Sequence, residues 1–391
     1  MHKKPLSLPV AAALVGIVAP GVVAAQTNVE IYGSIDVAFS HRGDNIAPHV
    51  GSRTSIDSGT ASGNRLGFRG TEDLGNGLKA LFTLEAGFKA DDGEHAQGGR
   101  LFGRQAYLGL TGGFGTVIAG RLYAPRYSLL SSLDPFGGAS VGQFNNVLDD
   151  VTFYGTTLAV ADVVRVDNAV AYVSPSLGGF NVTLAYATNA VAQEGGSAAP
   201  ITGQTDNDGD AKTWAILPRY KNGPLDVGFS YQNIKVDEIV PDGPSAKVRQ
   251  WSVGGAYDFN AVKLAAYYDQ YKATHSAFDN SEKLESWLIG ATIPFGKHAV
   301  RVSYTQSKFD DYTGDSDGKA RQWALGYSYA LSKRTNVFAI YSDISNDDAG
   351  GSDGGGDGNH KVHRHANAAD AYHGYGSGYQ NGFQVGLKHT F

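Results

Sequence analysis

The most constraining feature of this sequence is a repeated alternation of apolar and polar residues, in segments of about ten residues separated by turn residues. Near the start, Val29, Ile31 and Ile35 share one parity, whereas Glu30 and Ser34 have the other. The same division recurs at 226–232 and at 300–305. Because successive side chains of a strand point to opposite faces, each segment gives one apolar and one polar face. The pattern predicts an all-β chain.

Alternation alone is compatible with two architectures. A soluble sandwich hides its apolar face, whereas a transmembrane barrel turns that face to lipid and keeps a polar lumen. Beyond residue 25, no apolar run reaches the roughly 18 residues that a membrane helix needs. Lipid otherwise tolerates only closed barrels, because every backbone polar group must be satisfied internally. If this chain crosses a membrane, it must do so as a closed antiparallel β-barrel.

Residues 1–25 have the features of a cleaved signal peptide. Lys3 and Lys4 form a positive start, 6–23 is apolar, and small residues precede Gln26. Removing the segment takes away two of the 32 Lys+Arg and none of the 38 Asp+Glu, so the mature charge is 30 − 38, or −8. This acidity argues against a nucleic-acid partner, and the absence of Cys removes disulfides and thiol nucleophiles.

The lengths of the connections favour the barrel. Short turns are predicted at 73–77, 111–115, 176–179, 221–224, 259–261, 296–298 and 331–334. Longer polar segments lie at 41–62, 89–100, 123–164, 188–212, 237–247, 273–282, 310–319 and 346–379. Seven turns alternating with eight loops predict sixteen strands in one domain, residues 26–391, with both ends on the tight-turn side. Short turns on one side and long loops on the other are typical of outer-membrane barrels.

The four tryptophans add an independent sign. Trp214, Trp251, Trp287 and Trp323 are 37, 36 and 36 residues apart, and each follows a long polar segment on the apolar face. Indole rings are favoured at the headgroup level of a membrane. The spacing therefore predicts an aromatic girdle at one interface.

Several short segments, in this order, carry a resemblance to a known family. They are Val-Glu-Ile-Tyr-Gly at 29–33, Asn-Arg-Leu-Gly-Phe-Arg-Gly at 64–70, Glu-Asp-Leu-Gly-Asn-Gly at 72–77, Phe-Gly-Thr-Val at 114–117 before Gly120-Arg121, Asp-Pro-Phe-Gly-Gly at 134–138, and the terminal Phe391. Together they resemble the general trimeric porins of Gram-negative bacteria, over nearly all of the mature chain. The resemblance implies a homotrimeric outer-membrane channel for ions and small hydrophilic solutes, exported through the periplasm, in contact with lipid and lipopolysaccharide. It also implies that Phe391 acts as an assembly signal.

The same resemblance implies a pore constriction. The third loop, about 123–164, would fold into the barrel and narrow the pore, facing a ladder of arginines on the inner wall. The positions that match by motif are Arg65, Arg121 and Arg165, with Arg104 as a fourth candidate. Arg69 would share the face of Arg65, because the two are four residues apart on one strand. On the loop side, Asp134 stands where the family often has an acid, although the order here is Asp-Pro rather than Pro-Glu.

Charges on opposite walls of a narrow aqueous gap orient dipolar solutes and bias which ions enter. The arginines favour anions at the constriction, whereas the acidic loops favour cations at the mouth. Because screening acts over roughly 8 Å at physiological salt, the nearer charges should dominate. We therefore expect a weak preference for anions.

Other motifs point to no cofactor and no catalysis. Residues 206–210 resemble the start of a calcium loop but lack its glycine and its final Glu. Four histidines crowd the last loop, at His360, His363, His365 and His373, where glycine-rich flanks favour a surface loop over a metal site. No spaced nucleophile set is present. The alternatives are a substrate-specific channel, a barrel enzyme or adhesin, and a soluble β repeat.

Overall fold

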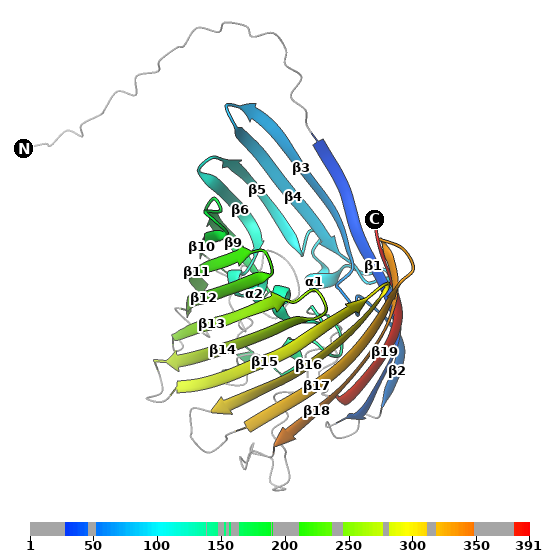
Figure 1. The fold of residues 1–391 in the computed structure, drawn as a ribbon. Coiled ribbons are helices and arrows are strands. Elements are labelled where there is room, and N and C mark those ends of the chain that lie inside the picture. The colour runs from blue at the N-terminus through cyan, green and yellow to red at the C-terminus, as the bar shows by residue number, and fades with distance from the viewer. Residues whose placement is uncertain are drawn as a thin grey trace, which may run out of the picture.

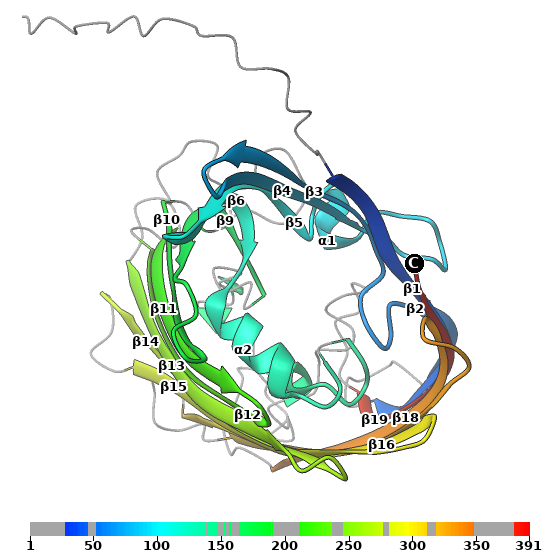
Figure 2. The same ribbon diagram turned by 45° about the horizontal axis from the view of Figure 1, so that its top comes forward.

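All strands outside loop 3 form one closed antiparallel sheet, labelled in Figure 1 and seen as a ring in Figure 2. The computed structural model describes residues 28–45, 52–137, 139–147, 152–153, 156–157, 164–188, 190, 211–236, 245–276, 281–310, 318–347 and 379–391. The strands of the sheet are β1 (Asn28–Asn45), β2 (Arg53–Ser58), β3 (Arg65–Gly75), β4 (Leu78–Gly87), β5 (Gln105–Gly112), β6 (Gly115–Tyr123), β9 (Arg165–Val173), β10 (Phe180–Ala187), β11 (Ala211–Asn222), β12 (Leu225–Val236), β13 (Ala246–Asp258), β14 (Lys263–His275), β15 (Ser281–Phe295), β16 (His298–Asp310), β17 (Gly318–Ala330), β18 (Thr335–Asp347) and β19 (Tyr379–Thr390). Four short elements lie in the loops: α1 (Ala96–Gly99), α2 (Pro125–Leu133), a 3₁₀ turn η1 (Phe144–Val147), and a two-residue hairpin of β7 (Thr152–Phe153) and β8 (Thr156–Thr157).

The seventeen segments of the sheet amount to sixteen strands. Segments β2 and β3 lie end to end along β1, since β2 pairs with its later half and β3 with its first residues. They form one strand that residues 59–64 interrupt. The sheet closes where β1 pairs with the last strand, so that Ser34 lies opposite Thr390. The prediction of sixteen strands is therefore confirmed.

All seven predicted tight turns join successive strands at one end of the barrel. The turn between β3 and β4 shows the chemistry: Asn76 and Gly77 both have positive φ, of 52° and 77°, which Asn and Gly tolerate best. The start of the first strand and the end of the last strand both lie at this end of the barrel, as predicted. Asn28 pairs with Thr71 near the turn between β3 and β4, and the Thr390 amide donates to the Arg334 carbonyl.

The apolar face of the barrel is on the outside. On β12, Val227 and Phe229 are 38% and 40% exposed, whereas Ser230 and Gln232 on the other face are 1% and 6% exposed. The same residues that alternate in the sequence thus divide into an apolar exterior and a polar interior. A soluble β repeat, which would hide its apolar face, is excluded. Among the residues that the structure describes, no helix is both long and apolar enough to span a membrane.

Candidate functional site

The described residues of loop 3, which runs from 123 to 164 between β6 and β9, partly fill the interior of the barrel. Its helix α2 begins with Pro125 at the first helical turn, and it lies within the ring of strands, along β11–β14 (Figure 2). Leu129, Leu133 and Phe144 of the loop are fully buried there, in a cluster with Leu217 and Leu288 of the wall. The described part of the loop therefore occupies lumen space along this side of the barrel.

A buried ion pair joins α2 to the wall. Arg126 donates to both carboxylate oxygens of Asp269 on β14, at 3.1 and 2.6 Å, and both side chains are only 2% exposed. Gln250 donates to the same carboxylate at 3.0 Å, and Arg219 of β11 donates to the Ser132 hydroxyl. Bidentate geometry fixes direction as well as distance, so this pair sets the register of the helix on the wall.

Glycines on the inner face let loop 3 approach the wall closely. A Cβ on Gly228 or Gly254 would lie 2.8 or 2.5 Å from the nearest carbon of Leu129 or Leu133. Farther along the loop, equivalent close contacts involve Gly290 with Pro135, Gly326 with Phe136 and Gly382 with Val141. We call Gly228, Gly254, Gly290, Gly326 and Gly382 the glycine row. Any larger side chain in this row would push the loop away from the wall.

Amide groups hold the second half of the loop. Gln322 of β17 donates to the carbonyls of Gly142 and Gln143 at 3.0 Å and accepts from Asn146. Gln384 of β19 accepts from the Val141 amide at 3.1 Å. Both glutamines are about fully buried, and each satisfies backbone groups that would otherwise lack a partner inside the barrel.

Asp134, predicted at the constriction, lies within the loop itself. Its carboxylate accepts the backbone amides of Phe136 and Phe144, each at 2.9 Å, and the residue is 7% exposed. Burial raises the pKa of this carboxyl to about 6, against the opposing effect of those hydrogen bonds. Asp134 thus closes the turn that follows α2, and in the described part of loop 3 no other acid is present.

A second segment, residues 59–64, turns inward between β2 and β3 around a buried carboxylate. Asp36 of β1 is fully buried and accepts the amides of Thr60, Ala61 and Ser62, the last at 2.9 Å. Ala61 then packs against the cluster that contains Phe136 of loop 3. This inward segment and loop 3 therefore meet across the lumen side of β1 and β17–β19.

Arginines gather on the part of the wall that α2 does not cover. Arg104 donates to Glu85 at 2.7 Å and to the Tyr123 hydroxyl at 2.7 Å, and Tyr32 also donates to Glu85. Arg165 lies over the Tyr123 ring, 5.3 Å from its centroid. The Glu85 carboxylate and the Tyr123 ring thus fix Arg104, directly before β5, and Arg165, the first residue of β9.

Asp167 of β9 organises the next pair. Arg121 and Arg100 both bind its carboxylate, Arg100 at 2.7 Å. Arg65 is half-buried, and its Nε donates to the Gly63 carbonyl of the inward segment at 3.2 Å. We call Arg65, Arg100, Arg104, Arg121 and Arg165, with Glu85 and Asp167, the arginine wall. Its five guanidinium groups outnumber its two carboxylates.

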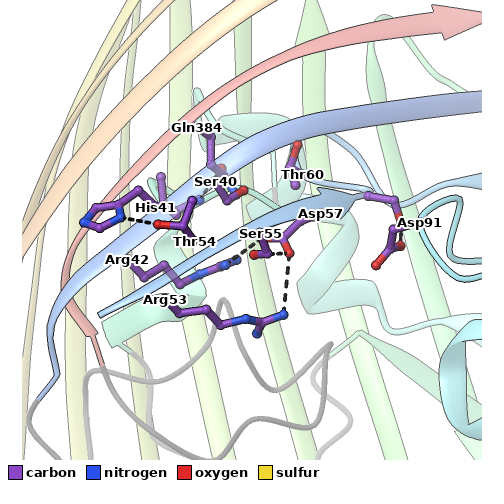
Figure 3. Close-up of polar contacts among 12 residues, drawn as sticks. Ser40, His41, Arg42, Arg53, Thr54, Ser55, Asp57, Thr60, Asp91 and Gln384 are labelled. Carbon is purple, nitrogen blue, oxygen red and sulfur yellow. Dashed lines mark hydrogen bonds and ion pairs between the residues drawn. The ribbon is translucent and has the colours of Figure 1, made fainter. Parts of the chain in front are cut away.

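A separate polar cluster lies toward the loop end of β1, β2 and β19 (Figure 3). Arg42 is buried and bonds Asp57 at 2.6 Å, while Arg53 lies 3.7 Å from the same carboxylate and Ser55 donates to it. Figure 3 shows Gln384 beside this cluster, close to the first strand. The cluster ties the ends of these strands together.

The comparison with protein families decides what kind of barrel this is. The family described as Gram-negative porin matches residues 10–349. The chain belongs to the Gram-negative porin family. A porin of Bordetella pertussis, an outer membrane porin protein, is 37% identical over 63% of this chain and 65% of its own length. Outer membrane porin protein 32 of Delftia acidovorans is 31% identical over 66% of this chain and 68% of its own.

Solved structures agree with the family. An anion-selective porin from Comamonas acidovorans has 29% identity and a TM-score of 0.72, covering 94% of this chain and 100% of that one. A trimer form of OmpT from Vibrio cholerae shares the fold, with 15% identity and a TM-score of 0.62 over 93% and 99%. This porin is an outer-membrane channel protein, and the expectation that it is no enzyme is confirmed.

The structure brings most of the predicted constriction arginines of this porin together and sets one apart. Arg65, Arg104, Arg121 and Arg165 belong to the arginine wall, whereas Arg69 pairs with Glu30 at 2.8 Å nearer the tight-turn end. Sequence reasoning missed Arg100, Glu85 and Asp167. Glu85 and Asp167 could have been found, because each lies on the polar face of its strand within three residues of a predicted strand end.

The tryptophans of this porin form part of a continuous outward row of rings. Trp214, Trp251, Trp287 and Trp323 pack on tyrosines of the next strand, with centroids 5.2, 5.1, 5.3 and 5.2 Å apart. The row consists of Tyr186, Trp214, Tyr231, Trp251, Tyr268, Trp287, Tyr304, Trp323, Tyr341 and Phe383. It gives each strand from β10 to β19 one ring at the same level, which we call the aromatic row.

Phe391 completes the seam between the first and last strands. Its amide and carbonyl bond those of Gly33, at 3.2 and 3.0 Å. Its ring lies so close to Gly33 that a Cβ there would overlap it. The role of Phe391 as an assembly signal stays a prediction.

Some predictions concern residues outside the described part of the chain. These are the signal peptide at 1–25, the acidic segment 206–210 and the histidines of the last loop. Within the described residues, no group of three or more His, Asp or Glu side chains is arranged to hold a metal.

Proposed function

We propose that this porin passes small hydrophilic solutes by passive diffusion and that the arginine wall gives it a preference for anions. The wall's excess of guanidinium groups is the observation that carries the proposal. Loop 3 fills the side along β11–β14, so ions must pass near the arginines. The name of the Comamonas porin, anion-selective, supports the same reading at 29% identity.

The absence of an acid on the described lumen face of loop 3 strengthens this preference. Asp134 is directed at its own loop, so it does not offset the arginines across the gap. A unit charge about 4 Å from an ion contributes about 1 kcal/mol even at the dielectric constant of water. Each wall arginine that is not fully neutralised therefore favours anions over cations several-fold.

The test is the reversal potential of single channels in a planar bilayer under a potassium chloride gradient. The wild type should show anion preference, and Arg65→Gln should lower the anion-to-cation permeability ratio several-fold, because Arg65 lacks an ion-pair partner among the described residues. Arg249→Gln, which removes an outward-facing charge of β13, is the matched control and should change nothing. An unchanged ratio in Arg65→Gln would refute the constriction role of that residue.

We also propose that the protein is a homotrimer, with β3–β6 facing the neighbouring copies. The aromatic row runs from β10 to β19, whereas β4 and β5 present Leu84, Ala86 and Leu108 outward, with Leu108 66% exposed. Rings are stabilised where a barrel meets headgroups, and small aliphatic side chains allow close packing between proteins. The row would then contact lipid and lipopolysaccharide. The trimer form of OmpT is a precedent within the fold.

A further inference from the structure

A recess opens at the tight-turn end of the lumen, on a part of the wall that α2 does not cover. It has an open volume of about 1090 Å³ and is lined by β16–β19 together with Phe136 and Gly137 of the loop tip. No residue of the arginine wall lines it. The residues that line the recess are therefore distinct from those of the arginine wall.

Three of the residues that line this recess are lysine or arginine: Arg301, Lys388 and Lys297 of the turn between β15 and β16. Arg301 of β16 and Lys388 of β19 are both half-buried lining residues. Arg301 donates to the Ser328 hydroxyl at 2.9 Å. In the described part of the chain, neither Arg301 nor Lys388 has a carboxylate at ion-pair distance, in contrast to the arginine wall with its Glu85 and Asp167.

The nearest acid to Lys388 is already engaged. Lys388 lies opposite Asp36 on one side and Asn336 on the other. The Asp36 carboxylate is directed at the amides of Thr60 and Ser62, and no ion pair joins it to the lysine. Asp36 attracts Lys388 electrostatically, whereas Arg301 and Arg65 repel it.

Arg301 and Lys388 together carry more positive charge than Asp36 can offset, and such an excess of half-buried cations is costly unless an anion binds to them. The groups around the recess match an oxyanion better than a halide. A guanidinium fork, an ammonium, the Ser328 hydroxyl and the Asn336 amide offer several donors, and a planar or tetrahedral oxyanion can accept them together. Phe136 and Phe338 provide an apolar side.

We propose that this recess is a binding site for solutes that carry a carboxylate or phosphate group, held between Arg301 and Lys388. The proposal rests on the proposed function to the extent that anions must enter the pore. The site would retain such solutes briefly at one end of the channel, so their flux would saturate while chloride flux would not.

The experiment records chloride current through the channel while inorganic phosphate, or succinate in a separate series, is added to the side of the tight turns. In the wild type, each effective anion should reduce the current along a saturable curve. Arg301→Gln with Lys388→Gln should raise the half-saturating concentration at least about tenfold, because both charge-assisted contacts are lost. Arg334→Gln, which removes a charge from a turn at the same end but outside the recess, should leave the curve unchanged.

The outcomes separate the possibilities. Block by phosphate alone, by succinate alone or by both supports the site and identifies the group it prefers. If neither anion reduces the chloride current along a saturable curve, the proposal is overturned. It is also overturned if Arg334→Gln or Arg165→Gln raises the half-saturating concentration as much as the double variant does. The charge-preserving pair Arg301→Lys with Lys388→Arg should retain block, which guards against a folding defect. The reversal potential tests the proposed function independently, because the potassium chloride solutions contain no oxyanion.

Discussion

At the scale of single residues, the partner of each charge decides its role. Arg126 is held by Asp269 with both side chains buried, so it serves as an anchor and is not available to solutes. Arg104 and Arg121 share carboxylates with neighbours and keep part of their positive field. Arg301 and Lys388 face open space instead. Chemically similar residues thus differ in their surroundings: Arg126 anchors loop 3, whereas we propose selection for the arginine wall and binding for Arg301 and Lys388.

Asp134 gives loop 3 a dependence on pH. Its folded-state pKa of about 6 lies above the ordinary value of 3.8, so the folded loop holds the proton more tightly than the unfolded chain. The contribution of Asp134 to loop packing is therefore largest below pH about 4, and it declines as the pH rises through 6, by on the order of 3 kcal/mol. A spin label at Ser131 should become more mobile over this range.

The matched variants make this test specific. Asp134→Asn cannot ionise, so label mobility should no longer change between pH 4 and 7. Asp73→Asn, at an exposed tight turn, should keep the wild-type profile. If the label in the wild type shows equal mobility at both pH values, the buried carboxyl does not control the loop.

At the scale of elements, one repeated pattern serves both faces of the barrel. Trp251, Trp287 and Trp323 are each followed, three residues later, by a member of the glycine row. Because an odd spacing in a strand switches faces, the indole points outward and the glycine inward. The same three strands therefore carry the aromatic row outside and the seat of loop 3 inside.

Filling the glycine row should release loop 3. In Gly254→Val, the new Cβ would lie 2.5 Å from Leu133, so the loop must shift, at a cost of about 1–3 kcal/mol. We expect higher single-channel conductance and weaker ion selectivity, measured in planar bilayers. Gly113→Val, in a turn with open space around the glycine, should conduct like the wild type. Equal conductance in all three proteins would contradict the seating role of the row.

At the scale of the whole molecule, the exterior has two different sectors. The aromatic row covers β10–β19, whereas the outward side chains of β4 and β5 include Leu84, Ala86 and Leu108. A lipid-facing surface accommodates an added ring, whereas a packed interface does not. The sectors can therefore be told apart by one kind of substitution.

Leu108→Trp on β5 should prevent close packing of neighbouring copies, so the trimer should dissociate at lower temperature on heating in mild detergent. Ile289→Trp on β15 is the matched control, because both residues are large, aliphatic and exposed, at 66% and 59%. The trimer of the control should melt like the wild type. Identical melting of both variants would place the interface elsewhere.

The sequence by itself determined the strands, the turns, the two faces and the outward tryptophans of this porin. These features depend on local rules: parity along a strand, turn residues such as Asn76 and Gly77, and the spacing of Trp251 and Trp287. Local rules can be read from neighbouring residues, because backbone geometry fixes where each side chain points. The constriction arginines came from family resemblance, and their role stays a prediction.

Only the tertiary structure decided which side chains contact each other inside the barrel. Arg126 binds Asp269, 143 positions away in the chain. The Asp134 carboxylate accepts hydrogen bonds from its own loop, whereas the family resemblance implied an acid on the loop facing the arginines. Such contacts depend on how far loop 3 bends and which strand it reaches. Parity along a strand shows that a residue faces the lumen, but the packing of a loop on sixteen strands selects its partner.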